Sequence, residues 1–154
     1  MDRRPNDAAR PPVAGLRALT ARLGGAGLCR LVGDLDLDTA PVARAALART
    51  LALPCMLLCV DLRDVPFCSC AGPNLLLAAR TTTRRTGRTL VLLAPGTSVL
   101  RLLRVSGTAG LFAVHPDLRH AVRAFRRRVA AARPAGPRRT APQVGRGPGP
   151  WPGA

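Results

Sequence analysis

The chain has 154 residues, of which 47% are hydrophobic, so it is long enough to fold one domain around a substantial core. Aromatic residues make up only 3%, which requires that core to be aliphatic. No apolar run approaches the roughly 20 residues that cross a bilayer, and the first residues contain no apolar signal segment. We therefore expect a cytoplasmic protein that has no membrane partner.

The net charge of +16 comes from arginine, because the chain contains neither lysine nor glutamate. Half of the excess lies in residues 123–154, which carry arginines and no acid. This segment could bind nucleic acid, but we favour a solvated helix end followed by a tail. Residues 1–12 carry three prolines among charged and small residues, and residues 131–154 are rich in Arg, Pro and Gly without periodicity. We therefore predict disordered ends around one domain over residues 13–130.

The first predicted elements form an antiparallel hairpin at the edge of a sheet. Its strands are Leu16–Leu23 and Leu28–Val32, joined by a turn over Gly24–Gly27. The acidic stretch GDLDLDTAP follows, but it has neither the glycine nor the glutamate that an EF-hand calcium loop requires. We therefore reject calcium binding there.

A helix is predicted to follow the acidic stretch and to run through Leu51. Asp38 or Thr39 would cap its N-terminus, and Pro41 suits its first turn. Val42, Ala45, Ala46 and Arg49 fall at helical spacing and predict its inner face.

Strands and helices alternate through the second half of the chain. Met56–Val60 is apolar throughout, as expected of a central strand covered on both faces. The further predicted elements are a helix over Pro73–Thr86, a strand over Thr89–Leu93, a helix over Thr97–Val105, a strand over Leu111–Val114 and a helix capped by Asp117 that runs to about Ala130. This alternation predicts an α/β fold: a mixed, mostly parallel sheet of about five strands with about four helices, preceded by the antiparallel edge hairpin.

The five cysteines form no Cys-x-x-Cys pair that would indicate zinc, and their odd number argues against a complete set of disulfides. Cys29, Cys55 and Cys59 fall in or beside apolar strand patterns, where we expect them to pack as small hydrophobic residues. The chain also lacks a Ser/His/Asp set and a glycine-rich phosphate loop. We expect no enzymatic activity, no cofactor and no metal.

Five motifs, in order along the chain, resemble the STAS domain of bacterial anti-sigma factor antagonists. They are the GDLD turn at Gly33–Asp36, VDLRDVPF at Val60–Phe67, SCAG at Ser69–Gly72, GRTLVL at Gly87–Leu92, and the turn from Ser106-Gly107 to Leu111-Phe112. The resemblance covers roughly Leu16–Val122 and implies a STAS-like fold.

The resemblance also implies a binding protein. Members of this family bind an anti-sigma factor, usually a serine kinase with a histidine-kinase-like ATPase fold, and thereby release a sigma factor for transcription. The kinase phosphorylates a serine in an Asp-Ser-Ser-Gly motif at the start of the helix after the central strand, and the phosphorylated form dissociates. We therefore expect an anti-sigma factor as the partner of this chain.

The chain departs from the family at the phosphorylated position. Ser69, Cys70, Ala71 and Gly72 stand where the family has Asp-Ser-Ser-Gly, so the phosphoacceptor serine is replaced by Cys70. A thiol is not the usual substrate of a serine kinase, and Ser69 lies one residue early. The contact residues that the resemblance implies are Asp34, Asp36, Cys68, Ser69, Cys70, Ala71, Gly72 and Asn74.

Other interpretations of these residues remain open. Cys70 at a helix N-terminus could be redox-sensitive, although we favour a small residue that fits a tight turn. Ser69 is more typical of a helix cap than of a phosphate acceptor. Asp34 and Asp36 could equally contact a partner or form a solvated turn. Two alternative functions follow: a nucleic-acid-associated protein that uses the basic tail, and a thiol-based sensor at Cys70.

Overall fold

A tight hairpin opens the part of the chain that the computed structural model describes, residues 15–134 and 136. Strands β1 (Arg17–Leu23) and β2 (Ala26–Val32) pair antiparallel. Gly24 and Gly25 form the two-residue turn with φ angles of +58° and +85°. Positive φ at both positions suits a type I′ turn, which matches the twist of the flanking strands. The predicted hairpin is confirmed, and its second strand begins two residues earlier than expected.

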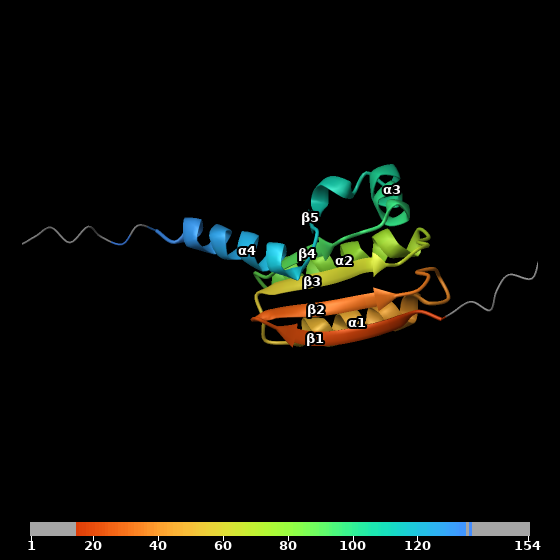
Figure 1. Ribbon diagram of the computed structural model, residues 1–154, viewed down its shortest axis with the longest axis horizontal. Coiled ribbons are helices and arrows are strands. Elements are labelled where there is room, and N and C mark those ends of the chain that lie inside the picture. The colour runs from red at the N-terminus through yellow and green to blue at the C-terminus, as the bar shows by residue number, and fades with distance from the viewer. Residues whose placement is uncertain (1–14, 135, 137–154) are drawn as a thin grey trace, which may run out of the picture.

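Helices and strands alternate after the hairpin. They are α1 (Ala40–Leu51), β3 (Leu57–Asp64), α2 (Ala71–Arg85), β4 (Thr89–Leu93), α3 (Thr97–Val105), the short 3-10 helix η1 (Ala109–Leu111), β5 (Ala113–His115) and α4 (Leu118–Ala132). The strands lie in the order β1-β2-β3-β4-β5, and every pair except β1 with β2 is parallel (Figure 1). The predicted mixed sheet, mostly parallel and with an antiparallel edge hairpin, is confirmed.

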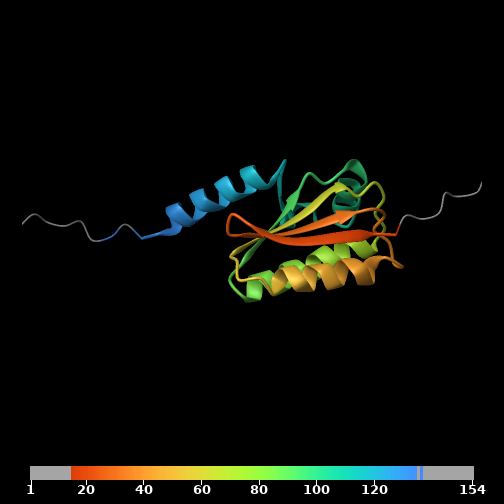
Figure 2. The ribbon, with the colours of Figure 1, turned by 60° about the horizontal axis from the view of Figure 1, so that its bottom comes forward.

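Helices cover the sheet on both faces. Figure 2 shows α1 and α2 side by side beneath the strands, with α4 on the opposite side. Alternate residues of β3 belong to the two cores: Val60 and Leu62 pack toward α1 and α2, whereas Leu57 and Cys59 pack toward α4. Burial on both faces explains why this strand is apolar at successive positions. The expected central strand is therefore confirmed.

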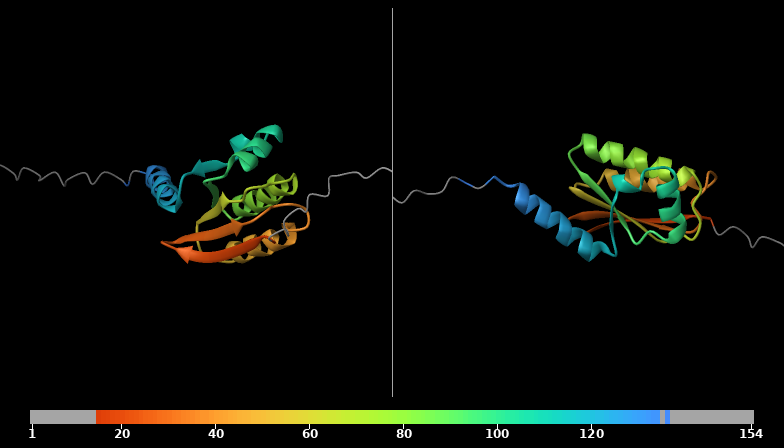
Figure 3. Two further views of the ribbon diagram at one scale, coloured as in Figure 1. Left: turned by 45° about the vertical axis from the view of Figure 1, so that its right-hand side comes forward. Right: turned by 90° about the horizontal axis from the view of Figure 1, so that it is seen from above.

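The helices also reach the two ends of the sheet. Because β2 to β5 are parallel, α1, α2, α3 and α4 all begin near the carboxyl-terminal ends of strands. Helix α3 lies beside that end of the sheet, and α4 runs out past the opposite end (Figure 3). Asp117 caps α4 as predicted, because its carboxylate accepts a 2.9 Å hydrogen bond from the backbone N–H of His120.

Several sequence predictions need correction. The predicted strand Leu111–Val114 is β5 (Ala113–His115), because Leu111 belongs to η1, and the helix expected over Pro73–Thr86 begins two residues earlier. Strand β3 begins after Met56 and runs on to Asp64, so Asp61 is a buried strand residue that accepts hydrogen bonds from the backbone and side chain of Arg63. The inner face of α1 consists of Ala40, Ala43, Ala46, Leu47 and Thr50, whereas Val42 is 44% exposed. Small alanines let the helix approach the sheet closely, and buried Thr50 donates its hydroxyl to the carbonyl of Ala46.

The predicted disordered ends lie mostly outside the described residues. Residues 1–14, 135 and 137–154 are not described, so the expected boundaries of the domain remain predictions. Helix α4 continues to Ala132, two residues past the expected limit. Among the described helices, none combines the length and hydropathy needed to cross a membrane.

Core packing predicts that alanine substitutions at two leucines lower the free energy of unfolding by very different amounts. Leu76 of α2 is fully buried, whereas Leu37 is 79% exposed. We expect Leu76→Ala to lower the free energy of unfolding by about 2–5 kcal/mol, because it leaves a cavity between α2 and the sheet. Leu37→Ala, the matched control, should change it by less than about 0.5 kcal/mol. Urea denaturation followed by circular dichroism measures both, and equal losses would contradict this packing.

Candidate functional site

The site predicted around Cys70 is built by backbone hydrogen bonds between two loops. Past the ends of β2 and β3, Gly33 N donates to Asp64 O at 2.9 Å and Leu35 N donates to Phe67 O at 3.0 Å. Ser69 N then donates to Leu35 O at 2.9 Å, so that Leu35 and Cys68 form an isolated parallel bridge. The parallel ladder thus continues beyond the strands and brings the acidic turn against the loop of Cys68–Gly72.

The acidic turn is held by Thr39 at the start of α1. The Asp36 carboxylate accepts a 2.9 Å hydrogen bond from Thr39 N, and the Thr39 hydroxyl oxygen accepts one from Asp36 N at 2.9 Å. Thr39 occupies the predicted N-cap position, but its hydroxyl bonds within the turn and accepts from no helical N–H. The half-buried Asp34 forms no side-chain hydrogen bond or ion pair with the described residues, so its carboxylate is open to a partner.

The start of α2 places Cys70 at the surface. Cys70 occupies the N-cap position, and the hydroxyl oxygen of the preceding Ser69 accepts a 3.2 Å hydrogen bond from Ala71 N, the first helical N–H. Gly72 N donates to the carbonyl of Ser69 at 3.0 Å, which tightens the first turn. These bonds occupy the loop backbone and leave the Cys70 side chain exposed, with Asn74 exposed one turn further along α2.

Glycine is required at position 72 by close packing. A Cβ there would overlap Cys68 Sγ and approach Leu35 Cδ2 to 3.3 Å. Cys68 and Leu35 are both buried, and they lie on the two bridged loops. The absence of a side chain at residue 72 therefore lets α2 begin directly against the acidic turn. Sequence reasoning placed Cys68 in the contact surface, whereas the structure places its thiol in the packing beneath that surface.

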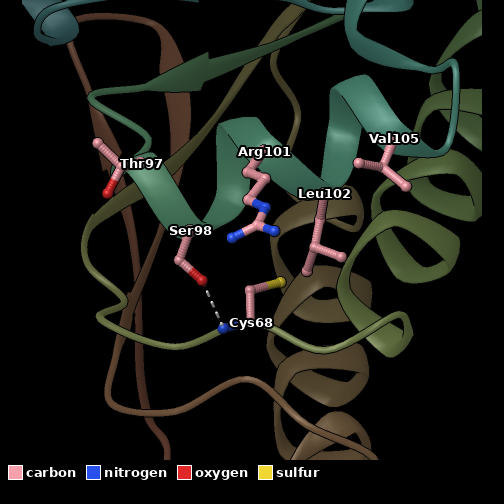
Figure 4. Close-up of a pocket in the computed structure, with 6 residues that line it drawn as sticks. All are labelled: Cys68, Thr97, Ser98, Arg101, Leu102 and Val105. Atoms are coloured by element: carbon pink, nitrogen blue, oxygen red, sulfur yellow. Dashed lines mark hydrogen bonds between the residues drawn. The ribbon is translucent and has the colours of Figure 1, made fainter.

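Two hollows flank the Cys70 loop. A groove of about 330 Å³ between α1 and α2 is lined at its near end by Leu37, Ala71 and Asn74. A second cleft, of about 640 Å³, lies between the loop and α3. Figure 4 shows Arg101 and Leu102 pointing from α3 into this cleft, where Ser98 accepts a 3.2 Å hydrogen bond from Cys68 N. The Cys70 loop (residues 68–72) and the acidic turn (residues 33–39) therefore form a ridge between two recesses.

Exposed apolar side chains at this ridge were not predicted from the sequence. Leu37 in the acidic turn is 79% exposed, and Phe67 before the loop is 46% exposed. The available signal was the presence of large apolar side chains in polar loops. It could not identify the exposed residues, because buried Leu35 and exposed Leu37 have similar sequence surroundings. Exposed apolar groups beside open polar ones are typical of a protein-binding surface.

The cysteines divide into one exposed thiol and four buried ones. Burial raises the pKa of Cys29 to about 11, that of Cys59 to about 12 and that of Cys68 to about 11. These three thiols remain protonated near neutral pH and pack as small apolar groups. Cys55 is also buried, so Cys70 is the one exposed cysteine, and all five are free thiols.

The ridge carries an exposed thiol between two recesses. Within residues 15–134 and 136, no group of three or more His, Cys, Asp or Glu side chains is placed to hold a metal ion. Cys70 lies between two recesses with apolar and carboxylate groups around it. A chemical group attached to residue 70 would therefore lie at the centre of any interface formed on this ridge.

Comparison with known proteins identifies the fold. The family model described as "Mlab, STAS domain" matches residues 18–116. An anti-sigma factor antagonist from Mycobacterium paratuberculosis superposes with a TM-score of 0.66 at 24% identity, covering 73% of this chain and 95% of that chain. The anti-sigma factor antagonist SpoIIAA, in its unphosphorylated form, gives 0.61 at 17% identity, covering 71% and 96%.

The same fold also occurs in a larger membrane protein. The murine Solute Carrier 26 family member A9 anion transporter gives a TM-score of 0.60 at 14% identity, covering 73% of this chain and 22% of that one. No curated protein matches the chain in sequence. At these identities the structural likeness establishes the fold, and function has to be argued from the site.

The contact at Gly72 predicts a non-additive pair of substitutions. Gly72→Ala should lower the free energy of unfolding by about 1–3 kcal/mol, because the added methyl group overlaps Cys68 Sγ. In a Cys68→Ala background, the same change should cost less than half as much, since the sulfur is gone. A double-mutant cycle measured by urea denaturation tests the contact. Additive losses would show that the two side chains do not meet.

Cysteine burial predicts the reactivity of the native protein. One thiol should react rapidly with a disulfide reagent such as dithionitrobenzoate near neutral pH, and five should react after unfolding, because only Cys70 is exposed. Cys70→Ser should abolish the rapid phase, whereas Cys55→Ser should leave it intact. A rapid phase that survives in Cys70→Ser would contradict the burial of the other four.

Proposed function

Because the chain belongs to the STAS domain family, matched over residues 18–116, we propose that it is an anti-sigma factor antagonist. It binds an anti-sigma factor through the ridge of the acidic turn and the Cys70 loop, and thereby releases a sigma factor for transcription. It acts by stoichiometric binding, without catalysis, and it acts in the cytoplasm, where transcription takes place. The proposed contact residues are Asp34, Asp36, Ser69, Cys70, Ala71 and Asn74, and buried Cys68 and Gly72 support them from beneath.

The observation that carries this proposal is the bridge between the two loops. It joins the acidic turn to the residues that stand in the family's phosphorylated motif, and it sets both in one surface. The groove between α1 and α2 opens from the same surface, with exposed Leu37 at its mouth. A protein partner can therefore bury apolar side chains in the centre and pair with carboxylates around them.

The replacement of serine by Cys70 implies different regulation. A phosphate at this exposed position would add nearly two negative charges in the middle of the contact surface, which is enough to reverse binding. Cys70 has no hydroxyl to accept phosphate, and the Ser69 hydroxyl is engaged with the helix backbone. We infer that this antagonist is not released by serine phosphorylation.

The proposed partner rests on the family resemblance. The proposed partner is an anti-sigma factor with a histidine-kinase-like ATPase fold and serine kinase activity. Arg101 in the cleft beside α3 and Asp34 in the acidic turn supply one positive and one negative group, so the surface offers charges of both signs. We do not propose a nucleic acid partner for this face, since its acidic turn would repel a phosphate backbone.

A second candidate is a thiol-based sensor on the same scaffold. It is favoured by one observation, that Cys70 is the one exposed thiol and lies in the contact surface. Oxidation there would change binding in the way that phosphate does in relatives. If mild oxidant weakens partner binding and Cys70→Ser removes the effect, this second function holds. An unchanged affinity after Cys70 oxidation would exclude it.

The proposed function is tested on the partner that co-purifies with the tagged chain. We expect a protein with an ATPase fold that also binds a sigma factor. Calorimetric titration should then show that Cys70→Asp weakens binding more than about tenfold, because a buried negative charge is added at the ridge. Thr81→Asp, which adds the same charge on an exposed turn of α2, should stay within about threefold.

Kinase assays separate the regulation from the binding. Incubation with the partner and ATP should leave the wild-type chain unmodified, whereas Cys70→Ser should gain phosphate and lose affinity. Phosphate on Ser69 of the wild-type chain, with release of the partner, would contradict the unswitched mechanism. Equal binding by Cys70→Asp and Thr81→Asp would instead contradict the contact surface itself.

A further inference from the structure

Four arginines converge on a cleft at the opposite end of the sheet from Cys70. The cleft has a volume of about 500 Å³, within the range of small-molecule sites. Arg80 and Arg84 come from the last turns of α2, Arg88 from the segment before β4, and Arg128 from α4. Thr83, Thr89 and the backbone around Leu111 and Ala113 complete the lining, and no acidic residue contributes to it.

Two of these guanidinium groups are held in place by neutral oxygens. Arg80 Nε donates to the carbonyl of Leu111 at 2.8 Å. Arg88 donates from Nε to the Thr86 hydroxyl at 3.0 Å and from Nη1 to the carbonyl of Leu53 at 3.2 Å. Each keeps further N–H donors for a ligand, because a guanidinium carries five. The side chains of Arg84 and Arg128 form no hydrogen bond or ion pair with any described residue.

The acidic residues lie elsewhere. The six described aspartates are in the carboxyl-terminal parts of strands or in the loops that follow them, at the Cys70 end: Asp34, Asp36, Asp38, Asp61, Asp64 and Asp117. The cleft lies where β4 and β5 begin. Four like charges that converge without a carboxylate repel one another, and a bound anion is what would offset that repulsion.

We propose that this cleft binds a phosphate-bearing anion, with a diphosphate as the matching chemistry. Guanidinium groups offer paired N–H donors that fit phosphate oxygens, and several arginines from different elements can surround one diphosphate. Helix α2 is 15 residues long, so the cleft is about 20 Å from Cys70. The anion and the partner at the ridge can therefore bind at the same time.

The test uses inorganic pyrophosphate and two variants of equal charge. Arg84→Gln/Arg128→Gln removes the two cleft arginines whose side chains form no hydrogen bond or ion pair with the described residues. Arg104→Gln/Arg119→Gln removes two exposed arginines outside the cleft. Calorimetry at fixed ionic strength should show that the cleft variant loses more than about tenfold in affinity and the control less than about threefold. Thermal melts should show that both variants stay folded.

A second arm replaces pyrophosphate with phosphatidylcholine vesicles that contain phosphatidic acid. Selective loss of vesicle binding by the cleft variant would assign the phosphate to a lipid headgroup, and selective loss with pyrophosphate alone would assign it to a free ligand. Equal losses in both variants would mean that the net charge of +16 attracts any anion, and they would overturn the proposal. Failure of the wild-type chain to bind either probe would overturn it as well.

Discussion

The parallel ladder that continues past β2 and β3 is the constraint on which the candidate site depends. Three backbone hydrogen bonds between residues 33–35 and residues 64–69 fix the acidic turn against the Cys70 loop. Backbone groups left unpaired at the end of a sheet would cost free energy, so the bridge stabilises the chain as well as shaping its surface. Gly72 permits the arrangement because a larger residue would collide with Cys68. The shape of the proposed contact surface thus depends on strand pairing and on a glycine at position 72.

Parallel strands give the molecule two different ends. Helices start at the carboxyl-terminal end, where every described aspartate also lies, and α1 and α2 finish at the opposite end, where arginines gather. We propose that the two ends bind different partners: a protein with apolar and charged groups at the Cys70 ridge, and a phosphate-bearing anion at the arginine cleft. Substitutions at one end can be made without touching the other, which keeps the two proposals separable.

Local patterns predicted the elements well, because apolar runs and glycine turns are readable from neighbouring residues. The boundaries of β4 and α3 agree with expectation. Strand β3 runs past its apolar residues because its backbone stays paired with β2, through Arg30 with Asp61 and Val32 with Asp64. Of the predicted inner face of α1, Ala46 is buried, but Val42, Ala45 and Arg49 are exposed, because the helix packs on the sheet through Ala40, Ala43, Leu47 and Thr50 instead. Two features join residues that are far apart in the sequence: the bridge between Leu35 and Cys68, and the cleft lined by both Arg80 and Arg128. No local sequence pattern predicts such contacts.

Hydrogen–deuterium exchange on the complex with the anti-sigma factor tests the central claim most directly. If the bridged loops form the contact surface, backbone amides over residues 33–37 and 67–74 should exchange more slowly in the complex, together with the facing turns of α1 and α2. Amides around Arg84 and Arg88, at the far end of α2, should be unchanged and serve as the internal control. Protection confined to the far end, with residues 67–74 unaffected, would contradict the account.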